Sequence, residues 1–136
     1  MNNPIVLPRV LINRILQHAQ SDTEHEVCGL IARTKNGDFS CHPIDNIAST
    51  PDCLFQMDGK QQIDAMRNMR EQNAELFAIY HSHPHTAAAP SATDLLQANY
   101  TDALYIIVSL QQEGVLDLRG FFLRNNQVTI ASIEVT

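Results

Sequence analysis

Along the chain, stretches with apolar residues at helical spacing alternate with short, continuously apolar runs. Each change from one pattern to the other marks the limit of a predicted helix or strand. Segment 8–20 begins at a proline, which favours the first turn of a helix, and continues with apolar residues at helical spacing. These residues are Val10, Leu11, Ile15 and Leu16. Segment 59–73 has the same period and ends at Asn73. We therefore predict amphipathic helices over 8–20 and 59–73.

Short apolar runs bounded by turn residues predict the strands. The run 26–33 and the run 39–47 flank "KNGD", a turn signal that predicts a hairpin. The run 75–83 is continuously apolar until it becomes polar at His81, as in a central strand that leaves a sheet. The remaining predictions are strands at 53–58, 103–110, 114–124 and 127–135 and a short helix at 91–100.

Helices and strands interleave in this order, which indicates an α/β (α+β layered) fold with one mixed β-sheet flanked by helices. The chain has 136 residues, of which 44% are hydrophobic and 18% charged, enough for one core. We therefore expect a single domain over 1–136.

Charge and cysteine content narrow the function classes. The net charge is −6 and the nine Lys and Arg residues are scattered, so we expect neither a nucleic-acid partner nor a membrane surface. No cationic start precedes an apolar run, and no stretch approaches the roughly 20 apolar residues that span a bilayer. The three cysteines form no even set and no Cys-x-x-Cys pair. These features predict a cytoplasmic protein. They do not indicate its oligomeric state.

The stretch 81–94, "HSHPHTAAAPSATD", carries the candidate chemistry. Residues two apart on a strand share a face, so His81 and His83 project together at the end of the predicted central strand. Two imidazoles fixed in this way suit zinc, which takes about four N, O or S ligands. Asp94, returned by the loop, could supply the third ligand and leave a fourth position open to water.

A structural reading competes with the metal site. "SATD" matches a capping box with Ser91 as N-cap and Asp94 at the third helical position. Isolated histidines are also more often surface or core residues than ligands. Ser91 could serve both roles, whereas a metal-bound Asp94 would have one oxygen left for a cap.

The spacing of this stretch resembles the signature of the JAMM, or MPN-plus, zinc metalloproteases. That signature is His-x-His-Pro, six residues, and Ser-x-x-Asp, which here spans His81 to Asp94 without a departure. The family also has an upstream glutamate at the start of the first strand, and Glu26 in "EVCGLIA" matches it. The resemblance extends over nearly the whole chain and implies an MPN domain with a cytidine-deaminase-like architecture.

The resemblance implies a role for each matching residue. His81, His83 and Asp94 would bind one Zn²⁺ per chain, Glu26 would be the general base, and Ser91 would donate to the oxyanion. Short bacterial members of the family act on ubiquitin-like sulfur carriers. The implied activity is therefore hydrolysis of an amide bond after the C-terminal Gly-Gly of such a carrier, whose tail is the expected partner.

Other readings remain beside this one. The domain could be a non-catalytic MPN scaffold in a larger assembly, and Glu26 could be a solvated charge at a strand end. A small-substrate zinc hydrolase such as a deaminase ranks lower, because the Pro-Cys-x-x-Cys motif is absent. A Cys28 nucleophile ranks lowest, because an apolar strand would raise its pKa. His85 follows Pro84 and is expected to be a loop residue.

Overall fold

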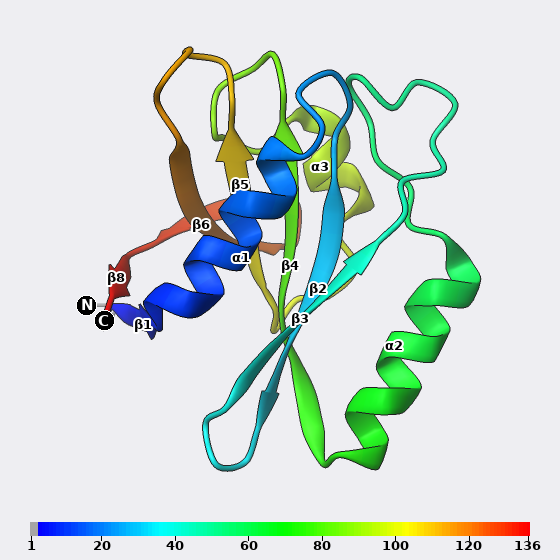
Figure 1. The fold of residues 1–136 in the computed structure, drawn as a ribbon, viewed down its shortest axis with the longest axis vertical. Helices are drawn as coiled ribbons and strands as arrows, with labels where there is room; N and C mark the ends of the chain where they lie inside the picture. Colours follow the sequence, from blue (N-terminus) through cyan, green and yellow to red (C-terminus); the bar gives the residue numbers. More distant parts are fainter. Residues whose placement is uncertain (1–2) are drawn as a thin grey trace.

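The centre of the structure, a computed structural model that describes residues 3–136, is a mixed six-stranded sheet (Figure 1). Its strands in spatial order are β3 (Phe39–Ile44), β2 (Cys28–Thr34), β4 (Ala74–His83), β5 (Leu104–Ser109), β6 (Asp117–Arg124) and β7 (Gln127–Ala131). Within this six-stranded sheet, only the β4–β5 pair is parallel. The predicted mixed sheet, the 26–47 hairpin and the central position of segment 75–83 are confirmed.

One face of the sheet is covered by α1 (Arg9–Gln20), which begins directly after Pro8 (Figure 1). Its buried residues are Leu11, Ile12, Ile15 and Ala19. They pack with strand residues such as Ile31, Tyr80 and Ile106 in the first core. Val10, predicted to belong to the apolar face, is 70% exposed, because the buried stripe is centred one residue further along the helix.

The opposite face is covered by α2 (Gly59–Glu71) and α3 (Ala92–Gln97). Asp58 caps α2 by accepting a hydrogen bond from the Gln61 amide. Met69 is the fully buried residue of α2, and it packs with Leu30, Ile79 and Ile107 in the second core. The fold is therefore three layers deep, with helices on both faces of the sheet.

Strand directions bring the functional segments to one end of the sheet. Strands β2 and β4 are antiparallel, and Cys28 at the start of β2 pairs with His81 near the end of β4. The loop that precedes β2 and the loop that follows β4 therefore meet at the upper end of the molecule in Figure 1.

Three boundary predictions were wrong. Segment 53–58 is a loop with one isolated bridge, between Asn46 and Met57. It forms no strand because the Asn46 side chain bonds the Leu54 carbonyl and the Gln56 amide, which a strand partner would otherwise bond. The helix predicted at 91–100 covers only Ala92–Gln97. Segment 127–135 is divided at Ser132 into β7 and β8 (Ile133–Val135), and β8 pairs in parallel with β1 (Ile5–Leu7), a strand that was not predicted. No helix among residues 3–136 is long and apolar enough to cross a membrane.

Candidate metal centre and active site

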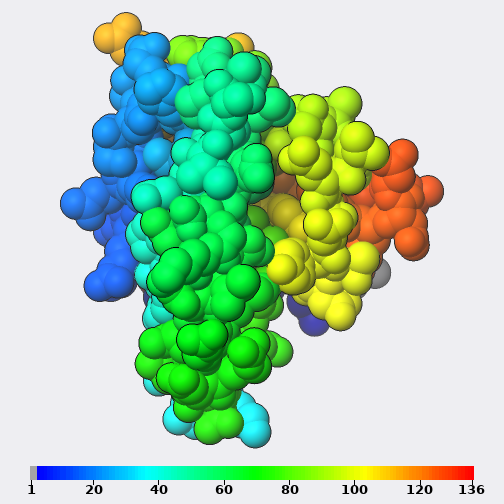
Figure 2. Space-filling model, turned by 90° about the vertical axis from the view of Figure 1, so that its right-hand side faces the viewer, coloured from blue at the N-terminus to red at the C-terminus, as the bar shows by residue number. Residues whose placement is uncertain are grey.

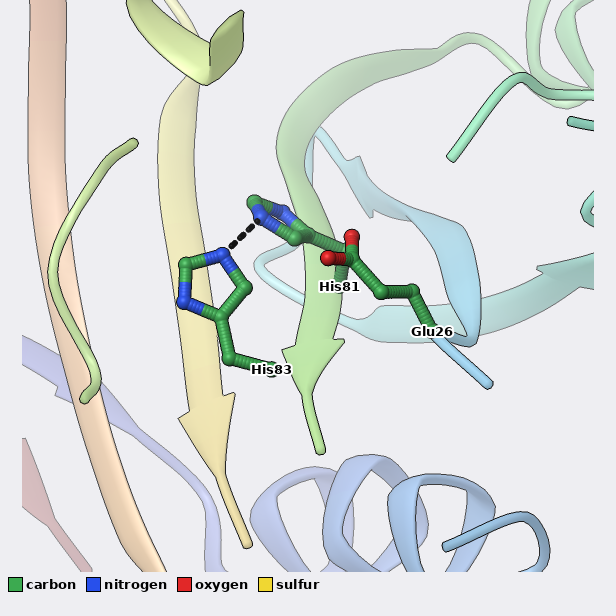
Figure 3. Close-up of side chains that lie close together, drawn as sticks. All are labelled: Glu26, His81 and His83. Carbon is green, nitrogen blue, oxygen red and sulfur yellow. Dashed lines mark hydrogen bonds between the residues drawn. The ribbon is translucent and has the colours of Figure 1, made fainter. Parts of the chain in front are cut away.

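His81 and His83 lie on the same face of β4 and are both buried (Figure 3). Ser82 between them faces the other side, where its hydroxyl accepts a hydrogen bond from the Val27 amide at 2.9 Å. Because successive side chains of a strand point to opposite faces, Ser82 bonds the backbone on one face while the two imidazoles lie together on the other. The expectation that His81 and His83 project together is met in the structure.

Asp94 completes a close group of three ligand-type atoms. The His81 and His83 Nε2 atoms are 3.1 Å apart, and Asp94 Oδ2 lies 3.2 Å from the first and 3.0 Å from the second. Four ligands at the usual Zn–N and Zn–O distances lie about 3.3–3.4 Å from one another in a tetrahedron. The three atoms therefore form a nearly equilateral triangle with sides slightly shorter than this spacing, close enough together to share one ion.

The capping box is present as well, and it uses the same residues. Ser91 Oγ accepts from the Asp94 amide at 3.0 Å, and Asp94 Oδ2 accepts from the Ser91 amide at 2.9 Å. We expected one carboxylate oxygen of Asp94 to contact the histidines and the other to accept the bond of the cap. Instead, Oδ2 alone contacts both histidine nitrogens and accepts from the Ser91 amide. The cap holds the carboxylate of α3 against the histidines, so the capping box and the group of Asp94 with His81 and His83 are present together.

The charges of the cluster follow from its hydrogen bonds. Burial alone would raise the pKa of Asp94, but the bonds from His81 and His83 outweigh it and hold this pKa well below its usual range. Burial lowers the pKa of His81. The pKa of His83 is raised, because contacts with Asp94 and the Ala87 carbonyl outweigh burial. The site thus presents an ionised carboxylate between two imidazoles.

The two rings are oriented by different neighbours. His83 Nδ1 lies 2.8 Å from the Ala87 carbonyl oxygen, and a ring that donates there presents Nε2 as a ligand. The His81 ring stacks on Phe55, with centroids 4.5 Å apart. Its buried Nδ1 has no hydrogen-bond partner within residues 3–136. Phe55 lies in segment 53–58, which the sequence predicts as a strand, and nothing in the sequence pattern indicates its contact with the site.

Glu26 lies two residues before β2, with its carboxylate turned toward His81 and His83 (Figure 3). One oxygen of Glu26 falls within 4.8 Å of a ligand nitrogen of each histidine. The residue is 5% exposed, and its Oε1 has no hydrogen-bond partner in the described chain. Burial raises the pKa of Glu26 to about 7. Asp94 Oδ2 is within hydrogen-bonding distance of both histidine nitrogens, and the Glu26 carboxylate lies beside this group.

A cavity of about 660 Å³ opens beside the site and appears as a hollow between the green and yellow atoms in Figure 2. Phe55 links the two, since it lines the cavity and stacks on His81. The lining residues are Phe55, Gln56, Met57, Gln62, Ile79, Gln97, Asn99, Tyr100 and Tyr105. None of them is charged, so the cavity suits a neutral ligand with peptide-like hydrogen-bonding groups.

The other candidates lie apart from the chemistry. His85 is exposed on the loop after Pro84. Cys28 is fully buried, and burial raises its pKa to about 12. Its thiol donates to the Ile44 carbonyl, 3.4 Å away. The expectation of a raised Cys28 pKa is confirmed, and a thiolate at this position is unavailable at neutral pH.

Comparison with known proteins identifies relatives of the whole fold. The family profile described as prokaryotic homologues of the JAB domain matches residues 8–122. The CysO-cysteine peptidase of Mycobacterium tuberculosis is 30% identical over 133 residues, which cover 96% of this chain and 90% of the relative. The desampylase of Haloferax volcanii is 30% identical over 101 residues, covering 70% of this chain and 73% of the relative.

A solved structure supports the same assignment. The solution structure of a protein from Desulfitobacterium hafniense superposes with a TM-score of 0.83 at 27% identity, covering 96% of this chain and 92% of the other. The six-stranded sheet and the site at its upper end are thus set in a fold with known counterparts. The chain therefore belongs to the family of prokaryotic homologues of the JAB domain and is a peptidase of the JAMM type.

Proposed function

We propose that the chain, acting as one domain over 1–136, is a zinc-dependent peptidase that hydrolyses the amide bond after the C-terminal Gly-Gly of a ubiquitin-like carrier protein. The observation that carries the proposal is the triangle of His81, His83 and Asp94, with sides of 3.0–3.2 Å, beside the buried carboxylate of Glu26. A cytoplasmic location stays a prediction.

His81, His83 and Asp94 would hold one Zn²⁺ per chain. Two imidazole nitrogens and a carboxylate oxygen are a donor set that zinc prefers at catalytic sites. When bound, zinc would supply Lewis acidity, which lowers the pKa of water and polarises a carbonyl group. Glu26 brings a carboxylate oxygen within 4.8 Å of both histidine nitrogens, and we assign it to proton transfer because Asp94 already supplies the carboxylate oxygen of the triangle.

Glu26 would take the proton from the attacking water and deliver it to the leaving amine. A general base works best when its pKa lies near the working pH, and burial raises the pKa of Glu26 to about 7. Its Oε1 makes no hydrogen bond within residues 3–136, so this oxygen is free to accept the proton.

Ser91 would stabilise the oxyanion of the tetrahedral intermediate. Its Oγ accepts a hydrogen bond from the Asp94 amide, and the hydroxyl proton is then available for donation. Loss of a single oxyanion donor costs about 10²–10³-fold in kcat in well-studied hydrolases. We expect Ser91→Ala to reduce kcat while α3 loses part of its N-cap.

The uncharged cavity next to His81 supports a Gly-Gly tail as the substrate. Side-chain-free residues approach a surface closely, and the amides and tyrosines of the cavity can bond their backbone groups. The names of the relatives, CysO-cysteine peptidase and desampylase, agree with cleavage at a carrier protein.

The test is an intact-mass assay with a sulfur-carrier protein that bears a C-terminal extension after Gly-Gly. Zinc-loaded protein should remove the extension, whereas Glu26→Gln should bind the same amount of zinc and leave the extension in place. His83→Ala and Asp94→Ala should lose both zinc and activity. If a panel of carriers shows no mass change although zinc is bound, the result would favour a non-catalytic scaffold over a peptidase. Native-rate cleavage by Glu26→Gln would remove Glu26 from the mechanism.

A further inference from the structure

Asn46, in the loop after β3, uses all four hydrogen-bonding positions of its side chain on backbone groups. Its Nδ2 donates to the carbonyl oxygens of Glu26 and Leu54, both at 2.9 Å. Its Oδ1 accepts from the amides of Ala48 and Gln56, both at 3.0 Å. A side chain satisfied in this way is held in one position, and it fixes the segments that it joins.

Glu26 depends on these contacts, because it lies outside the strand ladder. β2 begins at Cys28, so the sheet does not define the backbone of Glu26. Its carbonyl is bonded by Asn46 and its amide donates to the Pro51 carbonyl at 2.7 Å. Both partners belong to the loop 46–57, so this loop replaces the missing strand partners of Glu26.

The same loop reaches the other side of the metal centre. Leu54 and Gln56, which bond to Asn46, flank Phe55, and Phe55 stacks on His81 at 4.5 Å. One amide side chain thus connects the backbone of the general base to the loop that packs against a metal ligand.

We propose that Asn46 is a positioning residue that holds the Glu26 carboxylate at the catalytic distance by tying the Glu26 carbonyl to the loop 46–57. The catalytic part of this inference rests on the proposed function. The structural part, that the Glu26 backbone loses its position without the Asn46 amide donors, does not.

Asn46→Asp is the informative substitution. It is isosteric and keeps the acceptor for Ala48 and Gln56, but it removes both N–H donors. Gln61→Ala is the matched control, because Gln61 also has an amide side chain and it bonds the residue directly before this loop. It accepts from the Asp45 amide and donates to the Asp45 carboxylate, both at 2.8 Å, and forms no hydrogen bond with Glu26 in the described chain.

The first measurement is hydrogen exchange resolved to the single amide. In Asn46→Asp, the Glu26 amide, which bonds to Pro51, should exchange at least 10-fold faster, while amides of β4 and β5 stay protected. Gln61→Ala should leave the Glu26 amide within about threefold of the native rate. An unchanged Glu26 amide in Asn46→Asp would overturn the proposal, whatever the substrate of the enzyme is.

The second measurement is the kinetics of the mass assay with zinc content checked for each variant. Asn46→Asp should bind one zinc per chain, lower kcat by about 10–100-fold and change KM by less than threefold. Gln61→Ala should keep kcat within twofold. In a Glu26→Gln background, Asn46→Asp should cause no further loss of single-turnover rate, because the group that it positions is gone.

The outcomes separate the two hypotheses. If native protein cleaves no carrier but the Glu26 amide responds to Asn46→Asp, the proposed function fails and the positioning of Glu26 stands. If native protein cleaves and Asn46→Asp keeps its kcat, or loses activity equally with and without Glu26, the positioning role is wrong.

Discussion

The ring of Tyr80 on β4 occupies the space directly above Gly29 on β2, its cross-strand partner. A Cβ atom at Gly29 would lie inside van der Waals contact with the ring. Tyr80 is fully buried in the first core, so the ring has no room to move aside. The glycine that follows Cys28 in this chain is therefore required by packing.

Gly29→Ala should destabilise the protein by about 1–3 kcal/mol, the usual cost of overpacking a filled core. Gly59→Ala is the matched control, since no atom outside its own helix and chain neighbours lies within 4 Å of the added Cβ among the described residues. In the first turn of α2, alanine should be neutral or stabilising. Urea denaturation of both variants gives the comparison. Equal midpoints would contradict the packing argument.

His18 should make stability depend on pH below its ordinary pKa. Burial lowers the pKa of His18, whose Nδ1 lies 2.6 Å from the Tyr80 hydroxyl oxygen. The unfolded chain therefore binds the proton more readily, and the contribution of His18 is complete above about pH 6.5 and lost as the pH falls through the lower folded value.

His18→Asn keeps an acceptor for Tyr80 and removes the titration. The free energy of unfolding, measured at pH 5 and pH 7.5, should differ less in this variant than in the native protein. A difference of the same size in both proteins would show that His18 is not the responsible group.

Native thiol labelling should distinguish the three cysteines. Burial raises the pKa of Cys28 to about 12 and also raises that of Cys41, whereas Cys53 is exposed. One equivalent of iodoacetamide should therefore add at Cys53 at neutral pH, as read by peptide mapping. The variant Cys53→Ser should remain unlabelled until denaturant is added. Rapid labelling of Cys28 would reopen the thiol-nucleophile reading.

Metal removal should lower the melting temperature without unfolding the chain. Both cores are built from aliphatic and aromatic residues, and the two histidines are fixed by β4. After chelation, far-UV circular dichroism should be unchanged, and re-addition of zinc should raise the melting temperature in a concentration-dependent way. In Asp94→Ala, zinc should produce no such increase. Loss of the far-UV signal on chelation would instead mean that the metal is part of the core.

The strong local patterns predicted most elements correctly. The helical spacing over 8–20 and 59–73, the "KNGD" turn and the polar end of segment 75–83 are local signals. They correspond to α1, α2, the β2–β3 hairpin and the central strand β4. The errors fall where the decision is not local. In 53–58 the side chain of Asn46 competes for backbone groups, and at Ser132 the chain leaves one sheet for another.

The sequence by itself determined that His81 and His83 share one face of a strand, because side chains two residues apart on a strand point the same way, and it identified Ser91 and Asp94 as candidates through their spacing from this pair. Only the tertiary structure decided that Glu26, 55 residues before His81, faces them, that one oxygen of Asp94 meets both rings, and that Asn46 and Phe55 support the site. These contacts join distant segments through the antiparallel pairing of β2 with β4 and a loop without regular structure. Their energies depend on burial and geometry that no local pattern encodes.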